Sequence, residues 1–322
     1  MEEEPEGGGE GVKILFWGTP EFAVPSLRAL SEEGHDIVGV VTQPDRPAGR
    51  GRELRASAVK TETLDQSLRV LEPESTRGDD FVQEIAGLRA DLSVVVAYGQ
   101  ILSREVLDVP ALGSVNLHAS LLPALRGAAP INWSIVRGDT VTGVTVMRMV
   151  EQMDAGPILF QTEEPIDPEE TASDLRMRLS EIGAEALVEA LVLLETGMIE
   201  ELEQDESRAT YAPKVDRATA RVDWAGEPVA VSNFIRGMDA VPGAWSELEG
   251  HPVKLFRPEA DPEVVPGAGP GTILEADRDV GLLVATVQGA VRIREVQPPG
   301  KQRMDSSAWI LGRGATAGQH FE

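Results

Sequence analysis

The stretch SVNLHASLLPALRGAAPINW, residues 114–133, reads as a strand, a rigid bend and the start of a helix. Side chains alternate along a strand, so Asn116, His118 and Ser120 form a polar row on one face while apolar neighbours pack on the other. Pro123 fixes its φ angle and turns the chain directly after this row. Such a unit is typical of a doubly wound α/β sheet, whose ligands bind beyond the carboxyl ends of the strands.

Strand and helix patterns alternate on both sides of this stretch. Apolar runs typical of strands lie at residues 12–18, 36–42, 91–99 and 143–150, and helical spacing lies at residues 19–30 and 171–197. The alternation predicts a Rossmann-like, doubly wound α/β domain with a mostly parallel sheet. Its first turn, GTPEF at residues 18–22, lacks the G-x-G-x-x-G motif that lets a backbone approach a pyrophosphate, which disfavours NAD and FAD.

The pattern changes after Gly197, where a polar segment precedes short strand patterns separated by Gly and Pro. These strand patterns occupy residues 251–258, 271–276, 281–288 and 290–297 and predict a small, OB-like antiparallel barrel. The predicted organisation is a disordered acidic tail at residues 1–11, an α/β domain at 12–196, a linker at 197–212 and a C-terminal domain at 213–322.

Composition excludes several classes of protein. The chain has 322 residues and no cysteine, which excludes disulfides, thiolate zinc sites and a cysteine nucleophile. No apolar run approaches the ~18 residues of a membrane span, and the acidic start is not a secretory signal, so we expect a soluble, cytoplasmic protein. The net charge is −25, yet residues 213–322 hold 12 Lys and Arg against 15 Asp and Glu, so the acidity lies mainly before them.

A carboxylate joins the polar row in the predicted α/β domain. Asp154 lies in the turn DAGP that follows the strand pattern at residues 143–150. An Asp in such a turn is often only a turn former, and a polar pair at a strand end is often structural. The combination of Asn116, His118 and Asp154 nevertheless favours a reaction centre. The four histidines are too dispersed to suggest a metal site, so we expect no metal.

Several segments together resemble the methionyl-tRNA formyltransferase family. They occur in the family's order from Val12 to about residue 305, and they read GTPEFAVPSL, TQPDRPAGRG, VVVAYGQIL, NLHASLLPALRGAAPINW, TGVTVM, MDAGPIL, TYAPK and QPPGKQRM. The pattern N-x-H, SLLP and D-x-G marks the wider superfamily that uses 10-formyltetrahydrofolate. The basic loop QPDRPAGRG and the second domain resemble the tRNA-directed members.

The resemblance implies formyl transfer from 10-formyltetrahydrofolate, a co-substrate, to the amino group of methionyl initiator tRNA in translation initiation. Residues 12–196 would be the catalytic domain and 213–322 a tRNA-binding domain. Asn116 would donate a hydrogen bond to the developing oxyanion, and either His118 or Asp154 would move the proton. The implied folate-binding residues are Ser120, Leu121, Leu122, Pro123, Tyr98 and Gly99.

The resemblance also implies a set of basic tRNA contacts. The loop at residues 45–60 carries a net charge of +3, and its glycines predict a flexible loop that orders on a partner. The expected tRNA-binding residues are Arg46, Arg50, Arg52, Arg126, Lys214, Arg292, Arg294, Lys301 and Arg303. The chain departs from the family at Ala124 and Leu125, where a basic residue is frequent, and at Ala119, where glycine is common.

Two other functions remain open at this point. The chain could formylate a sugar or nucleotide amine, which binding of charged and uncharged tRNA would test. It could also be a non-catalytic folate- or RNA-binding module, although that class predicts a missing member of the Asn, His and Asp set. We expect a monomer that does not bind a membrane.

Overall fold

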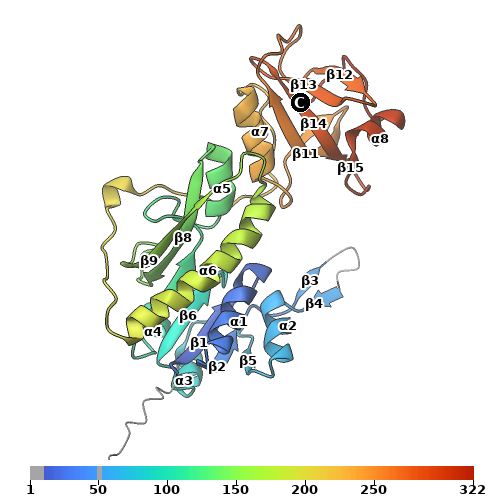
Figure 1. Cartoon of the computed structure of the whole chain (residues 1–322). Coiled ribbons are helices and arrows are strands. Elements are labelled where there is room, and N and C mark those ends of the chain that lie inside the picture. The colour runs from blue at the N-terminus through green and yellow to red at the C-terminus, as the bar shows by residue number, and fades with distance from the viewer. Residues whose placement is uncertain (1–10, 49–52) are drawn as a thin grey trace, which may run out of the picture. The chain divides into compact units, whose positions relative to one another are not determined.

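The computed structural model describes residues 11–48 and 53–322, and the chain divides into two compact units. The first unit comprises the chain up to Arg126 together with Gly143–Glu164 and Met177–Thr210. The second unit comprises Gly127–Thr142, Pro165–Arg176 and Tyr211–Glu322. Each unit therefore combines segments that are far apart in the sequence (Figure 1).

The first unit contains a seven-stranded sheet within its described residues. The strand order is β5 (Val70–Leu71), β2 (Asp36–Val41), β1 (Lys13–Gly18), β6 (Leu92–Val96), β7 (Ser114–His118), β8 (Val141–Arg148) and β9 (Ile158–Pro165). Strands β5 to β7 run parallel, and β8 pairs antiparallel to β7. The strand order reverses beside β1, which is the kind of switch point where ligands bind in doubly wound sheets.

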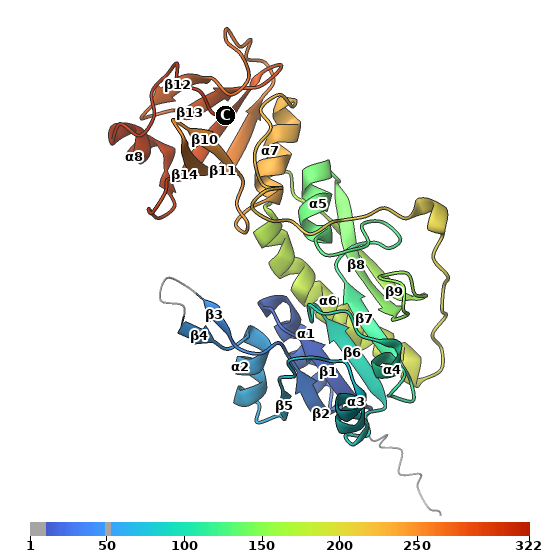
Figure 2. The ribbon, with the colours of Figure 1, turned by 180° about the vertical axis from the view of Figure 1, so that it is seen from behind.

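Helices cover both faces of this sheet because its strands are apolar on both sides. Helix α6 (Ala172–Glu195) crosses one face beside α1 (Val24–Glu32), which follows the short η1 (Glu21–Ala23), while α3 (Asp79–Ala86) and α4 (Arg104–Leu107) lie on the other face (Figure 2). Helix α2 (Ala58–Asp65) precedes β5. Gly183 lets α6 approach β7 closely, since a Cβ there would lie 2.7 Å from Leu117 Cδ2.

The second unit joins helices to an antiparallel sheet. The strand order is β10 (Trp245–Leu248), β11 (His251–Asp261), β14 (Ala290–Gln297), β13 (Gly281–Ala285) and β12 (Ile273–Asp277), with β15 (Met304–Asp305) paired to β14. Helices α5 (Pro130–Arg137), α7 (Pro228–Gly237) and α8 (Ser306–Leu311) belong to the same unit. Trp224 stacks on Phe321 with ring centroids 5.8 Å apart in its apolar core.

The predicted fold class is confirmed: a mostly parallel α/β sheet is followed by a curled antiparallel sheet. The sequence patterns did not predict β9, α7, or the hairpin of β3 (Arg46–Ala48) and β4 (Glu53–Arg55), which pair within the basic loop expected to be flexible. Strand β9 lies at the sheet edge and alternates exposed and half-buried residues after Leu159, so its polar and charged side chains hide the strand pattern in the sequence. No helix of the described chain is long and apolar enough to cross a membrane.

Candidate active site

Asn116 and His118 lie at the carboxyl end of β7, on the side of the strand opposite to Leu117. The register places Asn116 between Val95 of β6 and Met147 of β8, and His118 opposite Thr145. Leu117 points toward α6, where it faces Gly183. The alternation of a strand therefore places both polar side chains on the other face of the sheet.

Asp154 reaches the same place from the turn between β8 and β9. Its Oδ2 lies 3.8 Å from His118 Nδ1, and the two side chains are 15% and 7% exposed. Asp154 has a φ of 52°, in the left-handed region that Asp tolerates better than most residues. Gly156 is required in this turn because a Cβ there would collide with the carbonyl oxygen of Arg148. The structure thus brings together the three side chains that the sequence predicted.

The other nitrogen of His118 determines which nitrogen carries the proton in the neutral ring. Nε2 lies 3.0 Å from the carbonyl oxygen of Leu125. A carbonyl oxygen only accepts, so we assign the proton to Nε2, which leaves Nδ1 facing Asp154. In this state Nδ1 can accept a proton, and the resulting imidazolium would lie beside a carboxylate.

The side-chain amide of Asn116 is available to a ligand. The residue is half-buried, and its amide makes no hydrogen bond to any other residue in the described ranges 11–48 and 53–322. An amide that is fixed on a strand end and is not used by the protein can donate to a substrate oxygen.

The SLLP segment forms a wall held by its backbone. Ser120 Oγ donates to the carbonyl of Ala124 at 2.6 Å, and Thr145 Oγ1 donates to the carbonyl of Ser120 at 2.6 Å. Leu122 is buried, and Gln161 Nε2 donates to its carbonyl at 2.9 Å. Leu121 and Pro123 are partly exposed, whereas the Ser120 hydroxyl already donates within the protein, so the folate-binding role of residues 120–123 stays a prediction.

Tyr98 follows the neighbouring strand β6 and is almost completely buried, with its ring edge-on to Trp17 at a centroid distance of 5.3 Å. Burial raises the pKa of Tyr98 to about 12. Its hydroxyl and the buried Nε2 of Gln43 have no hydrogen-bond partner within residues 11–48 and 53–322. Tyr98 packs in the apolar cluster that also contains Phe81 and Val95, so its predicted contact with a pterin stays a prediction. Gly99 has a φ of 92°, which glycine adopts readily.

The predicted tRNA contacts differ widely in their surroundings. Arg126 is 1% exposed, and its guanidinium donates to Gln204 and Glu206. This geometry favours a structural role for Arg126 over contact with a phosphate. Arg46 is exposed and donates to Gln43 Oε1 at 2.9 Å, whereas Arg50 and Arg52 lie outside the described residues.

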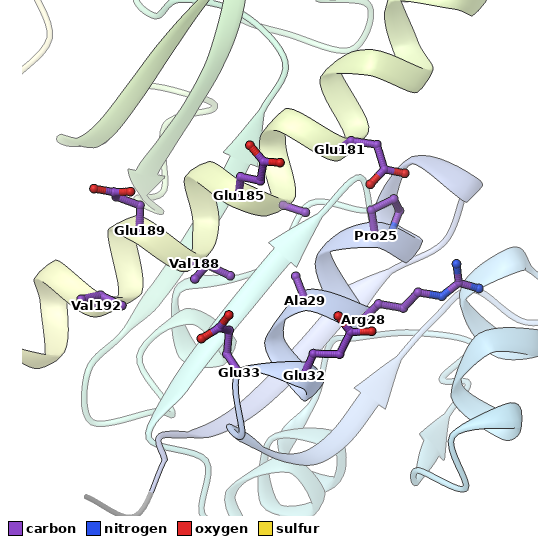
Figure 3. A pocket seen from close by; sticks show the side chains of 11 residues that line it. Pro25, Arg28, Ala29, Glu32, Glu33, Glu181, Glu185, Val188, Glu189 and Val192 are labelled. Carbon is purple, nitrogen blue, oxygen red and sulfur yellow. The ribbon is translucent and has the colours of Figure 1, made fainter.

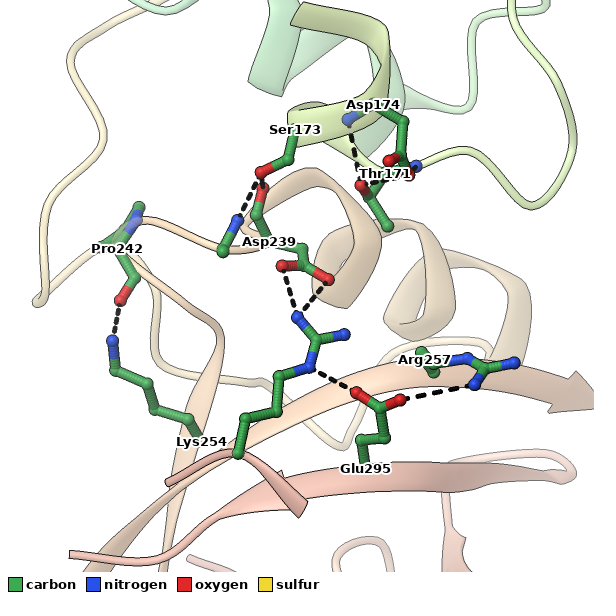
Figure 4. A network of polar contacts seen from close by, with 10 residues as sticks. Thr171, Ser173, Asp174, Asp239, Pro242, Lys254, Arg257 and Glu295 are labelled. Carbon is green, nitrogen blue, oxygen red and sulfur yellow. Dashed lines mark hydrogen bonds and ion pairs between the residues drawn. The ribbon is translucent and has the colours of Figure 1, made fainter. Parts of the chain in front are cut away.

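In the second unit, most of the predicted cations already have acidic partners. Arg294 pairs with Glu259 at 2.7 Å and Arg292 with Glu275 at 3.5 Å. Arg303 lies between Asp239 and Glu295 in the network shown in Figure 4, and its guanidinium also covers the ring of Phe256. Lys214 and Lys301 are exposed, and no ion pair to either is found among the described residues.

Sequence reasoning missed one cationic cluster. The guanidinium groups of Arg217 and Arg221 lie 5.3 and 5.6 Å from the ring centroid of Trp245. Trp245 Nε1 donates to the carbonyl of Arg217 at 2.6 Å, which fixes the ring. The two arginines follow Lys214 closely in the sequence, and this run of basic residues could have indicated the cluster. Cations around an aromatic ring suit contact with an RNA backbone or base.

A groove of about 540 Å³ between α1 and α6 has a different character. Its lining includes Glu32, Glu33, Glu181, Glu185 and Glu189 around an apolar floor (Figure 3). Its one cation, Arg28, pairs with Glu62 at 2.5 Å. This groove would repel RNA and the carboxylates of a folate, so it is not a candidate for either substrate.

Metal chemistry finds no support in the side-chain arrangement. Within residues 11–48 and 53–322, no group of three or more His, Cys, Asp and Glu side chains is placed to hold a metal ion. The carboxylate and the imidazole of the site face each other as a pair.

Comparison with known proteins gives matches over nearly the whole chain. The family models described as Formyl transferase and Formyl transferase, C-terminal domain, match residues 12–191 and 214–314. The methionyl-tRNA formyltransferase of Symbiobacterium thermophilum is 46% identical over 310 residues, which cover 96% of this chain and 95% of that protein. The methionyl-tRNA formyltransferase of Bacillus cytotoxicus is 43% identical, with 94% of this chain and 96% of that protein covered.

Solved structures show the same fold at lower identity. The sugar 3N-formyl transferase WlaRD has a TM-score of 0.64 and 17% identity, with 91% of this chain and 100% of that chain covered. HypX from Aquifex aeolicus in complex with tetrahydrofolic acid has a TM-score of 0.62 and 22% identity, with 94% of this chain covered. This chain spans about half the length of HypX, 47%. The full-length matches at the sequence level place the chain in the methionyl-tRNA formyltransferase family.

Proposed function

We propose that the chain transfers a formyl group from 10-formyltetrahydrofolate to the amino group of methionyl initiator tRNA, and that Asn116, His118 and Asp154 are its catalytic residues. The observation that supports the residue assignment is the distance of 3.8 Å between Asp154 Oδ2 and His118 Nδ1. Asn116 lies two positions before His118 on the same strand, with its side-chain amide available to a ligand. The co-substrate supplies a carbon at the formyl oxidation level.

Asn116 stabilises negative charge. Attack of the methionine amine on the formyl carbon moves an electron pair onto the formyl oxygen. The amide of Asn116 donates a hydrogen bond to that oxygen, and a prearranged donor at such a position contributes roughly 10²–10³-fold in rate. Since the amide has no hydrogen-bond partner among the residues that the structure describes, it breaks no bond to them when it acts.

His118 and Asp154 handle the proton. The attacking amine loses a proton as the new C–N bond forms, and the nitrogen that leaves takes one up. The geometry favours Nδ1 of His118 as the group that accepts the proton, because Nε2 already donates to Leu125. Asp154 then stabilises the imidazolium across 3.8 Å.

In the second unit we assign tRNA contacts to Lys214, Lys301 and the cluster of Arg217, Trp245 and Arg221. Their support is the exposure of the lysines, which form no ion pair among the described residues, and for the cluster two guanidinium groups near one ring whose Nε1 is hydrogen-bonded. Arg292, Arg294 and Arg303 have acidic partners that a phosphate would have to displace. A cytoplasmic location and a monomeric state stay predictions.

The test is a formylation assay with methionyl initiator tRNA and 10-formyltetrahydrofolate, read as formyl-methionine. We expect His118→Ala to lower turnover by roughly 10²–10⁴-fold, as for a lost acid–base group. His251→Ala is the matched control, because His251 is exposed at the start of β11 in the other unit. Wild-type turnover in His118→Ala would contradict the assignment, and formylation of an amino sugar instead of the tRNA would contradict the proposed acceptor.

A further inference from the structure

A polar segment that the sequence predicted as a linker lies against the candidate active site. This segment, residues 202–210, is called the strap below and belongs to the first unit together with β7, β8 and β9. Leu202 pairs with Ile158 through two backbone hydrogen bonds of 2.8 and 2.9 Å, so the strap begins with a single β-bridge to the first residue of β9. It then passes the turn that carries Asp154.

Gln204 of the strap forms hydrogen bonds to two backbone carbonyls of the turn, one on each side of Ala155. Its Nε2 donates to the carbonyl of Asp154 at 2.9 Å and to the carbonyl of Gly156 at 2.7 Å. An amide NH₂ group has two hydrogens, and these two bonds use both of them. Asp154 holds a left-handed φ of 52°, a conformation that persists where the surroundings fix it. Gln204 supplies such a restraint from a distant part of the chain.

Arg126 holds Gln204 in the orientation that this contact requires. The guanidinium donates to Gln204 Oε1 from Nε at 3.1 Å and from Nη2 at 2.8 Å. It also forms two hydrogen bonds of 3.0 and 2.8 Å to the carboxylate of Glu206, also in the strap. Because arginine can only donate, Gln204 must present its oxygen to Arg126 and its NH₂ group to the turn.

The end of the strap holds the backbone of Leu125, whose carbonyl lies against His118. Thr210 Oγ1 accepts a hydrogen bond from the backbone N–H of Leu125 at 2.9 Å. The carbonyl of Thr210 accepts one from the N–H of Arg126 at 2.9 Å, and its own N–H donates to Pro123 at 3.2 Å. Leu125 in turn supplies the carbonyl that meets His118 Nε2 at 3.0 Å.

We infer that Gln204 is a positioning residue for formyl transfer, which it supports by holding the Asp154 turn at its distance from His118. The inference rests on the proposed roles of those two residues. Gln204 touches neither substrate in this account. Its contribution is to keep the carboxylate where it stabilises the imidazolium, and displacement of a catalytic group by about 1 Å can cost roughly 10²-fold in rate.

A double-mutant cycle with Asp154 separates positioning from a general structural role. We expect Gln204→Ala to lower kcat by roughly 10–100-fold, with KM for the tRNA and the folate nearly unchanged. In the Asp154→Ala background, Gln204→Ala should cause no further loss, because the group that it positions is already absent. Gln204→Glu keeps an acceptor for Arg126 but removes the NH₂ donor, so it should lose activity like Gln204→Ala.

The control is Glu203→Ala, at the exposed neighbouring position of the strap, which should retain wild-type kcat. Wild-type kcat in Gln204→Ala overturns the inference, and so does a loss that adds fully to that of Asp154→Ala. Loss of cooperative thermal unfolding in both Gln204 variants also overturns it, since that would be a structural role. Wild-type activity of Asp154→Ala overturns the proposed catalytic role of Asp154, and the inference with it, whereas absence of tRNA formylation by the wild-type protein overturns the proposed function.

Discussion

The hydroxyl of Tyr98 illustrates how a single buried atom affects both stability and function. Tyr98 belongs to the apolar cluster of Trp17 and Phe81, and its hydroxyl has no hydrogen-bond partner in the described part of the chain. Burying a polar group without a partner costs about 1–3 kcal/mol of folding free energy. A protein that keeps such a group at the end of a strand near its active site retains an unsatisfied donor that a ligand can use.

Replacing this tyrosine should stabilise the protein. Tyr98→Phe removes the unpaired hydroxyl and leaves the ring packing in place, so we expect the free energy of unfolding at pH 7 to rise by about 1 kcal/mol. The burial that raises the folded pKa of Tyr98 to about 12 also predicts a pH dependence. Burial makes ionisation of Tyr98 more costly in the folded than in the unfolded state. Ionisation therefore leaves the free energy of unfolding unchanged below the unfolded pKa of about 10 and lowers it as the pH rises toward 12.

Urea unfolding of the two proteins at pH 7, 9 and 11 tests this prediction. The wild-type free energy of unfolding should fall between pH 9 and 11 by more than that of Tyr98→Phe. A lower stability of Tyr98→Phe at pH 7 would mean that the hydroxyl has a partner in solution, such as a bound water.

The residues of the site differ in how well the sequence predicted them. Asn116 and His118 are two positions apart on one strand, and Asp154 lies in a short turn, so local rules and a recognisable motif sufficed. Arg126 and Gln204 are 78 residues apart. No local pattern links them, and Arg126 was predicted as a tRNA contact from the family resemblance, which does not show the partners of an arginine within the fold.

At the scale of elements, β7 and α6 determine where the site lies. Helix α6 packs over β7 through the pair of Gly183 and Leu117, which orients the strand so that its polar side chains point to the opposite face. The apolar strands and this long helix were predicted because their periodicity is strong. Helix α7 and the edge strand β9 were not, since proline, glycine and charged residues interrupt their patterns.

Adding a methyl group between α6 and β7 should disturb both. In Gly183→Ala the new Cβ would lie 2.7 Å from Leu117 Cδ2, so the helix or the strand must shift. We expect a loss of about 1–3 kcal/mol in the free energy of unfolding, as for overpacking of a core. Glu185→Ala, at an exposed position of the same helix, is the control and should change stability by less than about 0.5 kcal/mol. Equal stability of the two variants in urea would show that the interface can relax.

At the scale of the whole molecule, charge is the main constraint on tRNA binding. The net charge is −25, and residues 213–322 are nearly balanced, with 12 Lys and Arg against 15 Asp and Glu. Binding of RNA to such a protein must depend on a few cations that have no acidic partner, because general attraction is absent. The sequence predicted the cations of the second unit as one class, whereas the structure separates them by their partners.

Two substitutions in the second unit should therefore differ in their effect on tRNA affinity. Lys214 is exposed, and no ion pair to it occurs in the described part of the chain, so Lys214→Ala should weaken binding and make the slope of log K against log salt less negative by about 0.7–0.9. Arg294 shares two hydrogen bonds of 2.7 Å with Glu259, so a phosphate gains little from it and Arg294→Ala should leave the slope nearly unchanged. Fluorescence titration of tRNA between about 50 and 200 mM salt measures both slopes. A larger change of slope in Arg294→Ala than in Lys214→Ala would contradict this prediction. It would mean that a tRNA phosphate displaces Glu259 from Arg294 on binding.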